Sequence, residues 1–352
     1  MHRDSDPRPT RLLVPDDTGI AEAAAILRAG GLVAFPTETV YGLGAHALDA
    51  RAVRGIFEAK GRPADDPLIV HLGVTDQVEG VAVANAVAWR LAERFWPGPL
   101  TLVLRKRSCV PLELTAGLPT VAVRVPAHAV AQALLLASGM PLAAPSANSF
   151  GRPSPTRAAH VLEDLDGRID AVIDAGATPV GVESTIVDVS RSPARLLRPG
   201  GLAAEAIEDV LGERLTRLAP PNSSQPGPQA APGLMPVHYS PRTALTLIVG
   251  EAASSAACLR NEVDAAVAAG KRVGVVALEE DRVMFAGSVR CQVVGSWADP
   301  VGSATRLFEV IRTLDAADLD VLFVRELADP SVGLGLALAD RLRRAAHRII
   351  QA

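Results

Sequence analysis

Polar residues and glycines gather in four segments of the first half of the chain. They are 36–44 (PTETVYGLG), 60–71 (KGRPADDPLIVH), 144–156 (APSANSFGRPSPT) and 181–185 (GVEST). Each borders an apolar run of β type, and α/β proteins bind ligands where their strands end. We therefore expect these segments to converge on one ligand site, to which Arg124 and the segment 198–200 (RPG) would add positive charge.

Four cations could supply that charge. Lys60 and Arg62 lie at the C-terminal end of an expected helix, where a cation also simply favours the helix dipole. The glycine between them and the proline after them indicate a shaped, exposed loop, so we favour a phosphate clamp, with Lys60 as a point charge and Arg62 as a bidentate fork. Together with Arg124 and Arg198 they would form a cationic pocket for a small polyanion such as a nucleotide.

The neutral residues of these segments are less decisive. Ordinary turn chemistry explains the hydroxyl and amide side chains about as well as ligand binding does; they are Thr39, Ser146, Asn148, Ser154 and Ser184. His71, in an apolar strand, is by itself more typical of a hydrogen-bonded core residue than of a catalytic base. The sequence contains no G-x-S-x-G elbow, H-E-x-x-H pair or Walker A loop, which disfavours acyl hydrolases, zinc peptidases and P-loop ATPases.

Composition limits the class of protein. A chain of 352 residues suggests two domains, and a net charge of −4 argues against a basic nucleic-acid coat protein. Three scattered cysteines fit neither a disulfide framework nor a metal site, and the polar first ten residues lack the apolar stretch of a secretory signal. The apolar run 129–144 is too short to cross a membrane, so we expect a helix followed by a strand there, in a cytoplasmic protein.

A proline-rich segment divides the chain. Residues 219–241 hold seven prolines and no Asp, Glu, Lys or Arg, which predicts an extended connector between domains at 1–218 and 242–352. Before it we expect a mixed sheet, with strands at 32–35, 68–72, 100–104, 120–125, 171–174, 184–189 and 195–198, and helices at 18–29, 49–61, 76–94, 127–138, 155–164 and 203–211.

The region after the connector alternates more regularly. Strands at 245–250, 272–278, 291–295 and 321–327, with helices at 253–269, 300–316 and 335–350, predict a smaller, Rossmann-like parallel sheet. The G-x-G-x-x-G fingerprint is missing after its first strand, and its sequence shows no catalytic cluster. A structural or regulatory role is therefore the better interpretation of this domain.

In this order, the motifs resemble a known family. PTETVYGLG, KGRP with PLIVH, APSAN with SPT, GVESTIVD and LLRPGGL resemble the YrdC-type domain of the threonylcarbamoyl-AMP synthase family. The connector's HYSP and the domain beyond it resemble the long, two-domain form. The resemblance implies a twisted mixed sheet with a concave basin and a linker that folds over it. Phe150 departs from the pattern, because the family usually has a small hydroxyl residue before this glycine.

The resemblance also implies a reaction, in which L-threonine, bicarbonate and ATP give threonylcarbamoyl-adenylate and pyrophosphate. Threonine would be held by Thr39, His71, Arg124, Ala144 and Ser184. ATP would be held by Lys60, Arg62, Asp66, Thr120, Ser146, Asn148, Ser154 and Arg198, with Tyr239 closing over it. Mg²⁺ would sit mainly on the phosphate oxygens, because the motifs supply no carboxylate cage. The product would pass to proteins that modify tRNA, and weak binding of tRNA itself fits this role.

The chemistry of this reaction needs no covalent enzyme nucleophile, since positioning and charge stabilisation can supply most of the catalysis. An alternative from another class is a module that uses the same basin as a groove for double-stranded RNA. The acidic net charge and the 3% of aromatic residues count against it. The prolines, with His238 and Tyr239, further suggest that the connector gates the basin.

Overall fold

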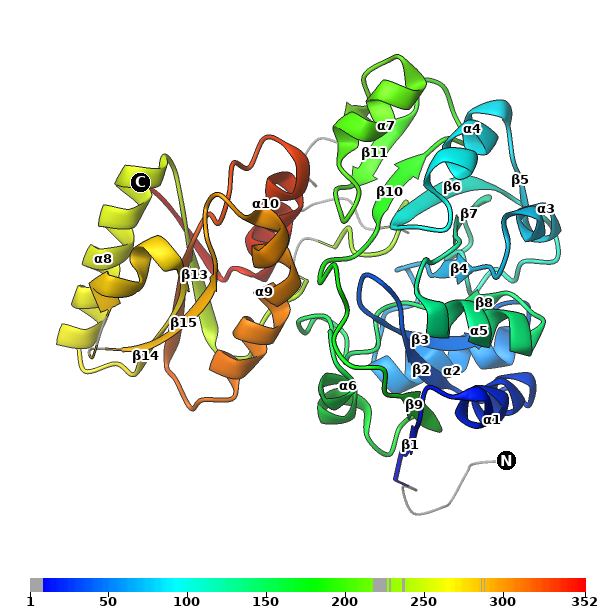
Figure 1. The fold of residues 1–352 in the computed structure, drawn as a ribbon, viewed down its shortest axis with the longest axis horizontal. Coiled ribbons are helices and arrows are strands. Elements are labelled where there is room, and N and C mark those ends of the chain that lie inside the picture. The colour runs from blue at the N-terminus through cyan, green and yellow to red at the C-terminus, as the bar shows by residue number, and fades with distance from the viewer. Residues whose placement is uncertain (1–8, 218–226, 228, 236–237, 286, 288) are drawn as a thin grey trace.

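The computed structural model describes residues 9–217, 227, 229–235, 238–285, 287 and 289–352. Two sheets lie side by side, each with its own helices, and the chain passes from the first to the second once (Figure 1). The predicted connector falls partly outside the described residues, at 219–226, 228 and 236–237. Its boundaries stay a prediction.

The first sheet has twelve strands in the order β1-β9-β2-β3-β8-β4-β7-β6-β10-β11-β12, with β5 paired to β6. The sheet contains both parallel pairs, such as β4 with β7, and antiparallel pairs, such as β6 with β7, so the predicted mixed sheet is confirmed. The strands are β1 (Arg11–Leu13), β2 (Val33–Pro36), β3 (Tyr41–His46), β4 (Ile69–His71), β5 (Ala82–Val83), β6 (Leu100–Lys106), β7 (Thr120–Arg124), β8 (Leu142–Ala143), β9 (Ala171–Ile173), β10 (Thr185–Asp188), β11 (Arg195–Arg198) and β12 (Thr216–Arg217).

The first two helices begin at side-chain caps that the sequence displays. The Asp16 carboxylate accepts a hydrogen bond from the Gly19 amide at the start of α1 (Asp17–Arg28), and Asp49 accepts one from Arg51 at the start of α2 (Ala50–Lys60). Gly61, at φ 62°, ends α2 in the left-handed conformation. The other helices are α3 (Val78–Val81), α4 (Ala86–Phe95), α5 (Ala129–Ser138), α6 (Ala158–Leu165) and α7 (Ala204–Leu211).

One expectation for this part was wrong, and one strand was not predicted. The single helix expected at 76–94 is a 3₁₀ turn η1 (Thr75–Gln77), α3, the short strand β5 and α4, because β5 pairs with β6 and Asn85 caps a new helix through the Ala88 amide. The motif 36–44 contains most of β3, which pairs with β2. A Cβ on Gly44 would lie 2.8 Å from the Phe35 ring, so this strand needs its glycine for packing rather than for a turn.

The second sheet is parallel throughout, in the order β15-β14-β16-β13-β17, as predicted. Its elements are β13 (Ala244–Val249), α8 (Ala252–Ala268), β14 (Val273–Leu278), η2 (Glu279–Phe285), β15 (Arg290–Gly295), α9 (Pro300–Asp315), β16 (Val321–Arg325), α10 (Gly333–Ala345) and β17 (Arg348–Gln351). The helix expected at 335–350 therefore ends early, since residues 348–351 pair with β13 instead.

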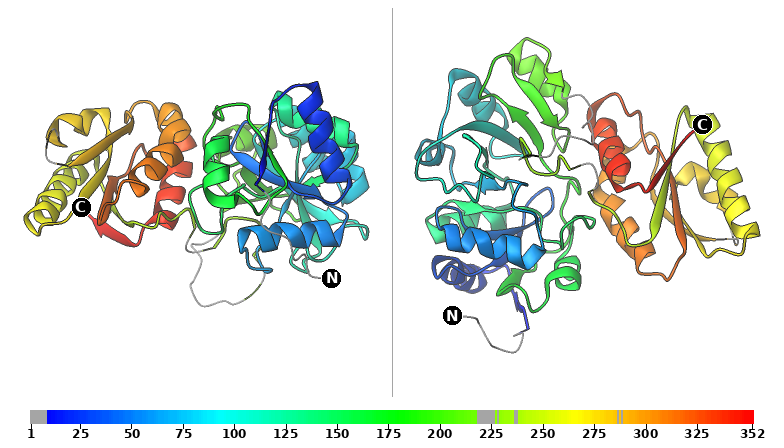
Figure 2. Two further views of the ribbon diagram at one scale, coloured as in Figure 1. Left: turned by 90° about the horizontal axis from the view of Figure 1, so that it is seen from below. Right: turned by 180° about the vertical axis from the view of Figure 1, so that it is seen from behind.

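Helices α9 and α10 lie between the second sheet and the first domain, and α8 covers the far face (Figures 1 and 2). The apolar core of the second sheet continues across this junction, where Val40, Val182 and Tyr239 join the same cluster as Phe308 of α9. The two domains therefore share packed surface next to the predicted site. No helix in the described part of the chain is long and apolar enough to cross a membrane.

Candidate active site

The four polar segments and both strand-end arginines converge on one pocket. It is lined by Thr37, Thr39, Val40, Gly42, Arg62, Ile69, His71, Arg124, Ala144, Pro145, Ser146, Glu183, Ser184, Arg198, Pro232, Gly233, His238 and Tyr239. All five residues predicted to bind threonine line this pocket. Four of the residues predicted to bind ATP also line it, namely Arg62, Ser146, Arg198 and Tyr239. They come from the ends of β4, β7 and β11, the β2–β3 turn, the loop after α2, the segment after β8, the residue before β10 and the connector.

Arg124 forms one wall of the pocket. Its Nη2 lies 2.6 Å from Glu38 Oε1, its Nη1 donates to Thr39 Oγ1 over 3.0 Å, and its Nε donates to the Gly98 carbonyl. The guanidinium is thus held in a fixed orientation before any substrate arrives, and it keeps a positive charge next to the cavity. Glu38 carries no signal of its own in the sequence, and only the fold shows that it is the partner of Arg124.

His71 lies beside Arg124, since the two residues are in register on the parallel strands β4 and β7. Burial, and then the positive charge of Arg124, lower the pKa of His71 from 6.5 to about 3. The imidazole is therefore neutral at physiological pH and can offer a hydrogen bond but no proton of an imidazolium.

Arg198 is a buried cation held by neutral groups. Its Nη2 donates to the Ser184 carbonyl over 3.0 Å, and its Nη1 donates to the Pro232 carbonyl over 3.1 Å. No carboxylate lies within ion-pair distance of it among the described residues. An anion entering the pocket would therefore meet a guanidinium whose direct partners are the carbonyls of Ser184 and Pro232 and the Ser184 hydroxyl.

Arg62 and Lys60 differ from Arg198 in their partners and in their position relative to the cavity. Arg62 forms a 2.8 Å ion pair with Asp66 and donates to the Pro67 carbonyl, so its own loop holds it at the edge of the pocket. Lys60 Nζ donates to the carbonyls of Ser146 and Asn148 over 2.6 and 2.5 Å. Burial lowers the pKa of Lys60 well below its ordinary value. In this state, Lys60 organises the segment 144–156 and does not line the cavity.

The remaining residues predicted to bind ATP do not line the cavity either. Asp66 is paired with Arg62, the Asn148 amide donates to the Arg152 carbonyl, and Ser154 Oγ donates to Glu183. Thr120 begins β7, at the opposite end from Arg124, although the alternation of side chains along a strand places both on the same face. The roles of these four residues stay predictions.

The connector covers the strand face that Thr120 shares with Arg124. Ala231 and Leu234 pack on Ile69, Val103, Ala122, Ile186 and Leu197, which form the floor of the sheet between Arg124 and Thr120. The cavity that remains has a volume of about 40 Å³. Since small-molecule sites usually measure roughly 300–1,000 Å³, the connector occupies space that a nucleotide would need.

His238 and Tyr239, near the end of the connector, pack next to the same pocket. Tyr239 is buried at φ 64°, a left-handed conformation that is costly for an aromatic residue, and its ring packs on Phe308. The Phe150 ring meets the ring of His238 edge-on, with centroids 5.7 Å apart. Phe150, which departs from the family pattern, therefore contacts the connector through His238.

Carboxylates at the pocket do not offer a free ligand set for a metal ion. Glu38 pairs with Arg124, Asp66 with Arg62 and Glu183 with Arg341. The described parts of the chain contain no group of three or more His, Cys, Asp or Glu side chains that could hold one. A protein-held magnesium cage does not fit these residues, whereas an ion carried on ATP phosphates needs no such cage.

The fold and pocket define a two-domain α/β protein with a buried, arginine-lined pocket between a mixed sheet and a connector. Two sequence families match it: one described as "Telomere recombination" (Sua5_yciO_yrdC) over residues 25–200, and "Threonylcarbamoyl-AMP synthase, C-terminal domain" over residues 202–347. The chain belongs to the threonylcarbamoyl-AMP synthase family of enzymes.

Relatives agree over almost the whole length. A threonylcarbamoyl-AMP synthase of Pyrococcus abyssi is 45% identical over 339 residues, 94% of each chain. One of Bacillus subtilis is 42% identical over 336 residues, 95% of this chain and 94% of that one. The solved structure of P. abyssi Sua5 complexed with L-threonine superposes with a TM-score of 0.90 at 42% identity, covering 97% of this chain and 99% of that one. The predicted family and fold class are confirmed, and the RNA-groove alternative is not favoured.

Proposed function

We propose that this enzyme forms L-threonylcarbamoyladenylate and pyrophosphate from L-threonine, bicarbonate and ATP. The observation that carries the proposal is the convergence, in one buried pocket, of all five predicted threonine contacts with the arginines predicted for ATP. Full-length relatives named for this activity support it.

Threonine would bind at the wall formed by Arg124. Its carboxylate suits the oriented guanidinium of Arg124, and Thr39 and Ser184 are hydroxyl groups in the same pocket that can bond its polar atoms. His71, being neutral, can accept from or donate to the substrate without competing with Arg124 as a second cation. The threonine amine is then free to react.

The reaction would proceed in two steps. The amine attacks carbon dioxide derived from bicarbonate and loses a proton, which gives a carbamate. A carbamate oxygen then forms a bond to the α-phosphorus of ATP, while the bond from that phosphorus to the bridging oxygen breaks and pyrophosphate leaves. Arg62 and Arg198 would stabilise the charge that builds up on the phosphate oxygens. Neither step requires a covalent intermediate with the protein.

ATP would take the place that Ala231 and Leu234 occupy on the sheet floor. Their departure would uncover the face shared by Ala122 and Thr120, and Tyr239 would close over the bound nucleotide. Mg²⁺ would accompany the phosphate oxygens of ATP.

We further propose that the enzyme is cytoplasmic, which is consistent with its three free cysteines. It would hand its product to tRNA-modifying proteins and bind tRNA weakly.

Measurement of pyrophosphate release tests the proposal. Release should require ATP, L-threonine and bicarbonate together, and omission of any one should reduce it to background. Release that persists without threonine would overturn the assignment of the reaction. Synthesis with labelled bicarbonate as the carbon source should place the label in the threonylcarbamoyl group of the product.

A further inference from the structure

Arg341, on helix α10 of the second domain, reaches two walls of the pocket. Its Nε donates to Glu183 Oε2 over 2.6 Å, and its guanidinium carbon lies 5.1 Å from the centroid of the Tyr239 ring. Its Nη1 donates to the neighbouring Asp340, which fixes the plane of the guanidinium. The Arg341 side chain is fully buried. A cation of the second domain is therefore built into the site of the first.

Glu183 transmits this contact to a predicted ATP residue. Its second carboxylate oxygen accepts a hydrogen bond from the hydroxyl group of Ser154, which is itself fully buried. Because the hydroxyl group has a single proton, this bond decides where the lone pairs of Ser154 point. The orientation of Ser154 thus depends on Glu183, and that of Glu183 depends on Arg341.

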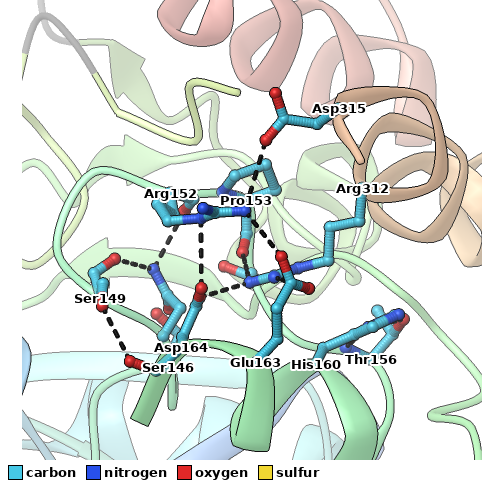
Figure 3. A network of polar contacts seen from close by, with 12 residues as sticks. Ser146, Ser149, Arg152, Pro153, Thr156, His160, Glu163, Asp164, Arg312 and Asp315 are labelled. Atoms are coloured by element: carbon cyan, nitrogen blue, oxygen red, sulfur yellow. Dashed lines mark hydrogen bonds and ion pairs between the residues drawn. The ribbon is translucent and has the colours of Figure 1, made fainter. Parts of the chain in front are cut away.

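Helix α9 holds the same loop from a second point. Figure 3 shows Arg312 next to Pro153, Glu163 and Asp164. Its Nη2 donates to the Pro153 carbonyl and, over 2.7 Å, to Asp164 Oδ2, and its Nη1 donates to Glu163 over 3.0 Å. Arg152 in turn reaches Asp315 at the end of α9 over 3.3 Å. Residues 152–154 are therefore held by two helices of the second domain.

Stability alone is a weak reason for these contacts. Burying an ion pair costs desolvation that largely offsets its attraction, and apolar side chains could seal a domain junction without that cost. What a buried guanidinium adds is direction, because its planar donors fix the position of the carboxylate that they bind. The position fixed here is that of Glu183 at the pocket.

We propose, on the basis of the function proposed above, that Arg341 is a positioning residue for nucleotide binding, which orients Ser154 through Glu183 while Arg312 fixes the adjoining backbone. The second domain then contributes to the ATP site through Glu183, in addition to anchoring the connector.

Arg341→Gln and Arg341→Lys in the full chain test this. Titration with ATP should give a dissociation constant at least about tenfold higher for the glutamine variant, as expected for loss of a charged hydrogen bond, with the lysine variant in between. The KM for ATP should rise in parallel, and the KM for L-threonine should change much less. Arg343→Lys, on the same helix but paired with Glu326, is the matched control and should bind ATP like the wild type.

A coupling measurement separates positioning from folding. Ser154→Ala should weaken ATP binding, and adding Arg341→Lys should weaken it no further, because both changes break the same chain of contacts. Arg341 variants that lower only the unfolding temperature, or that act additively with Ser154→Ala, would overturn the inference. If the glutamine variant does not fold, the lysine variant carries the test. Wild-type protein that binds ATP but releases pyrophosphate without threonine would instead overturn the proposed reaction, while the ATP titrations still test Arg341.

Discussion

Arg124 and Glu38 form an ion pair of 2.6 Å at the wall of the pocket, where their side chains are only 3% and 9% exposed. The pair leaves Arg124 with its guanidinium plane fixed by Glu38, Thr39 and Gly98. A threonine carboxylate would therefore bind a cation that is already oriented, and little reorganisation would accompany substrate binding.

Replacing Arg124 with lysine should raise the KM for L-threonine by about 10–100-fold, because an ammonium cannot keep the fixed fork that holds both Glu38 and the substrate. The KM for ATP should change far less. Steady-state pyrophosphate release over a range of threonine concentrations measures both. Arg105→Lys, exposed on the neighbouring strand β6, is the control. An unchanged threonine KM in Arg124→Lys would show that threonine binds elsewhere.

Removal of Arg62 should affect both stability and nucleotide binding. Arg62→Ala leaves Asp66 as an unpaired buried carboxylate, which should lower the free energy of unfolding by about 3–5 kcal/mol. The double change Arg62→Gln with Asp66→Asn removes both charges and should recover much of this stability, yet still bind ATP weakly. Urea unfolding and ATP titration on both variants provide the comparison. Normal ATP affinity in the double variant would remove Arg62 from the nucleotide site.

Weakening the contact between the connector and the sheet should strengthen apparent ATP binding. Leu234→Ala removes apolar contacts with the floor around Ile69 and Ala122, which should cost the covered state about 1–2 kcal/mol. ATP then competes with a weaker occupant, so its apparent dissociation constant should fall, up to about 30-fold. Leu112→Ala, at an exposed leucine, controls for a general effect of the substitution. Weaker ATP binding in Leu234→Ala would mean that Leu234 helps to hold the nucleotide rather than excluding it.

Stability should fall as the solution becomes acidic, starting below pH 6.5. Folded His71 has a pKa of about 3, so between pH 6.5 and 3 the unfolded chain binds a proton that the folded chain does not. The free energy of unfolding should drop by about 1.4 kcal/mol per pH unit from this residue alone. His160, whose burial lowers its pKa to about 4, should add to the slope over a narrower range. Urea unfolding of wild type and His71→Gln between pH 7 and 5 should show a shallower slope in the variant; equal slopes would contradict a buried neutral His71.

Local signals predicted much of the fold. Asp49 and Gly61 mark the two ends of α2 correctly because a side-chain cap and a left-handed glycine act within one turn of helix. The break of the expected helix 76–94 depends on pairing of β5 with β6, a contact made across the sheet, so helical periodicity could not reveal it. The same holds for β17, which pairs with the distant strand β13.

The same distinction, between local signals and contacts of residues far apart in the sequence, applies to the site. Motifs made of neighbouring residues predicted that these segments meet in one pocket, since strand ends on one sheet edge meet in space. Glu183 appeared only as part of a motif, and Arg341 is one of several arginines on an ordinary amphipathic helix. Nothing local distinguishes Arg341 from its neighbour Arg343; only packing against the first domain buries one and leaves the other half exposed.

The ion pair between Glu183 and Arg341 also limits how the two domains can be recombined with those of relatives. Its partners lie 158 positions apart, one in each domain. A chimera that joins the first domain of one relative to the second domain of another would have to bring matching residues at both positions, or leave a lone charge in the centre of the molecule. Exchange of one domain between relatives therefore requires that this pair stay matched.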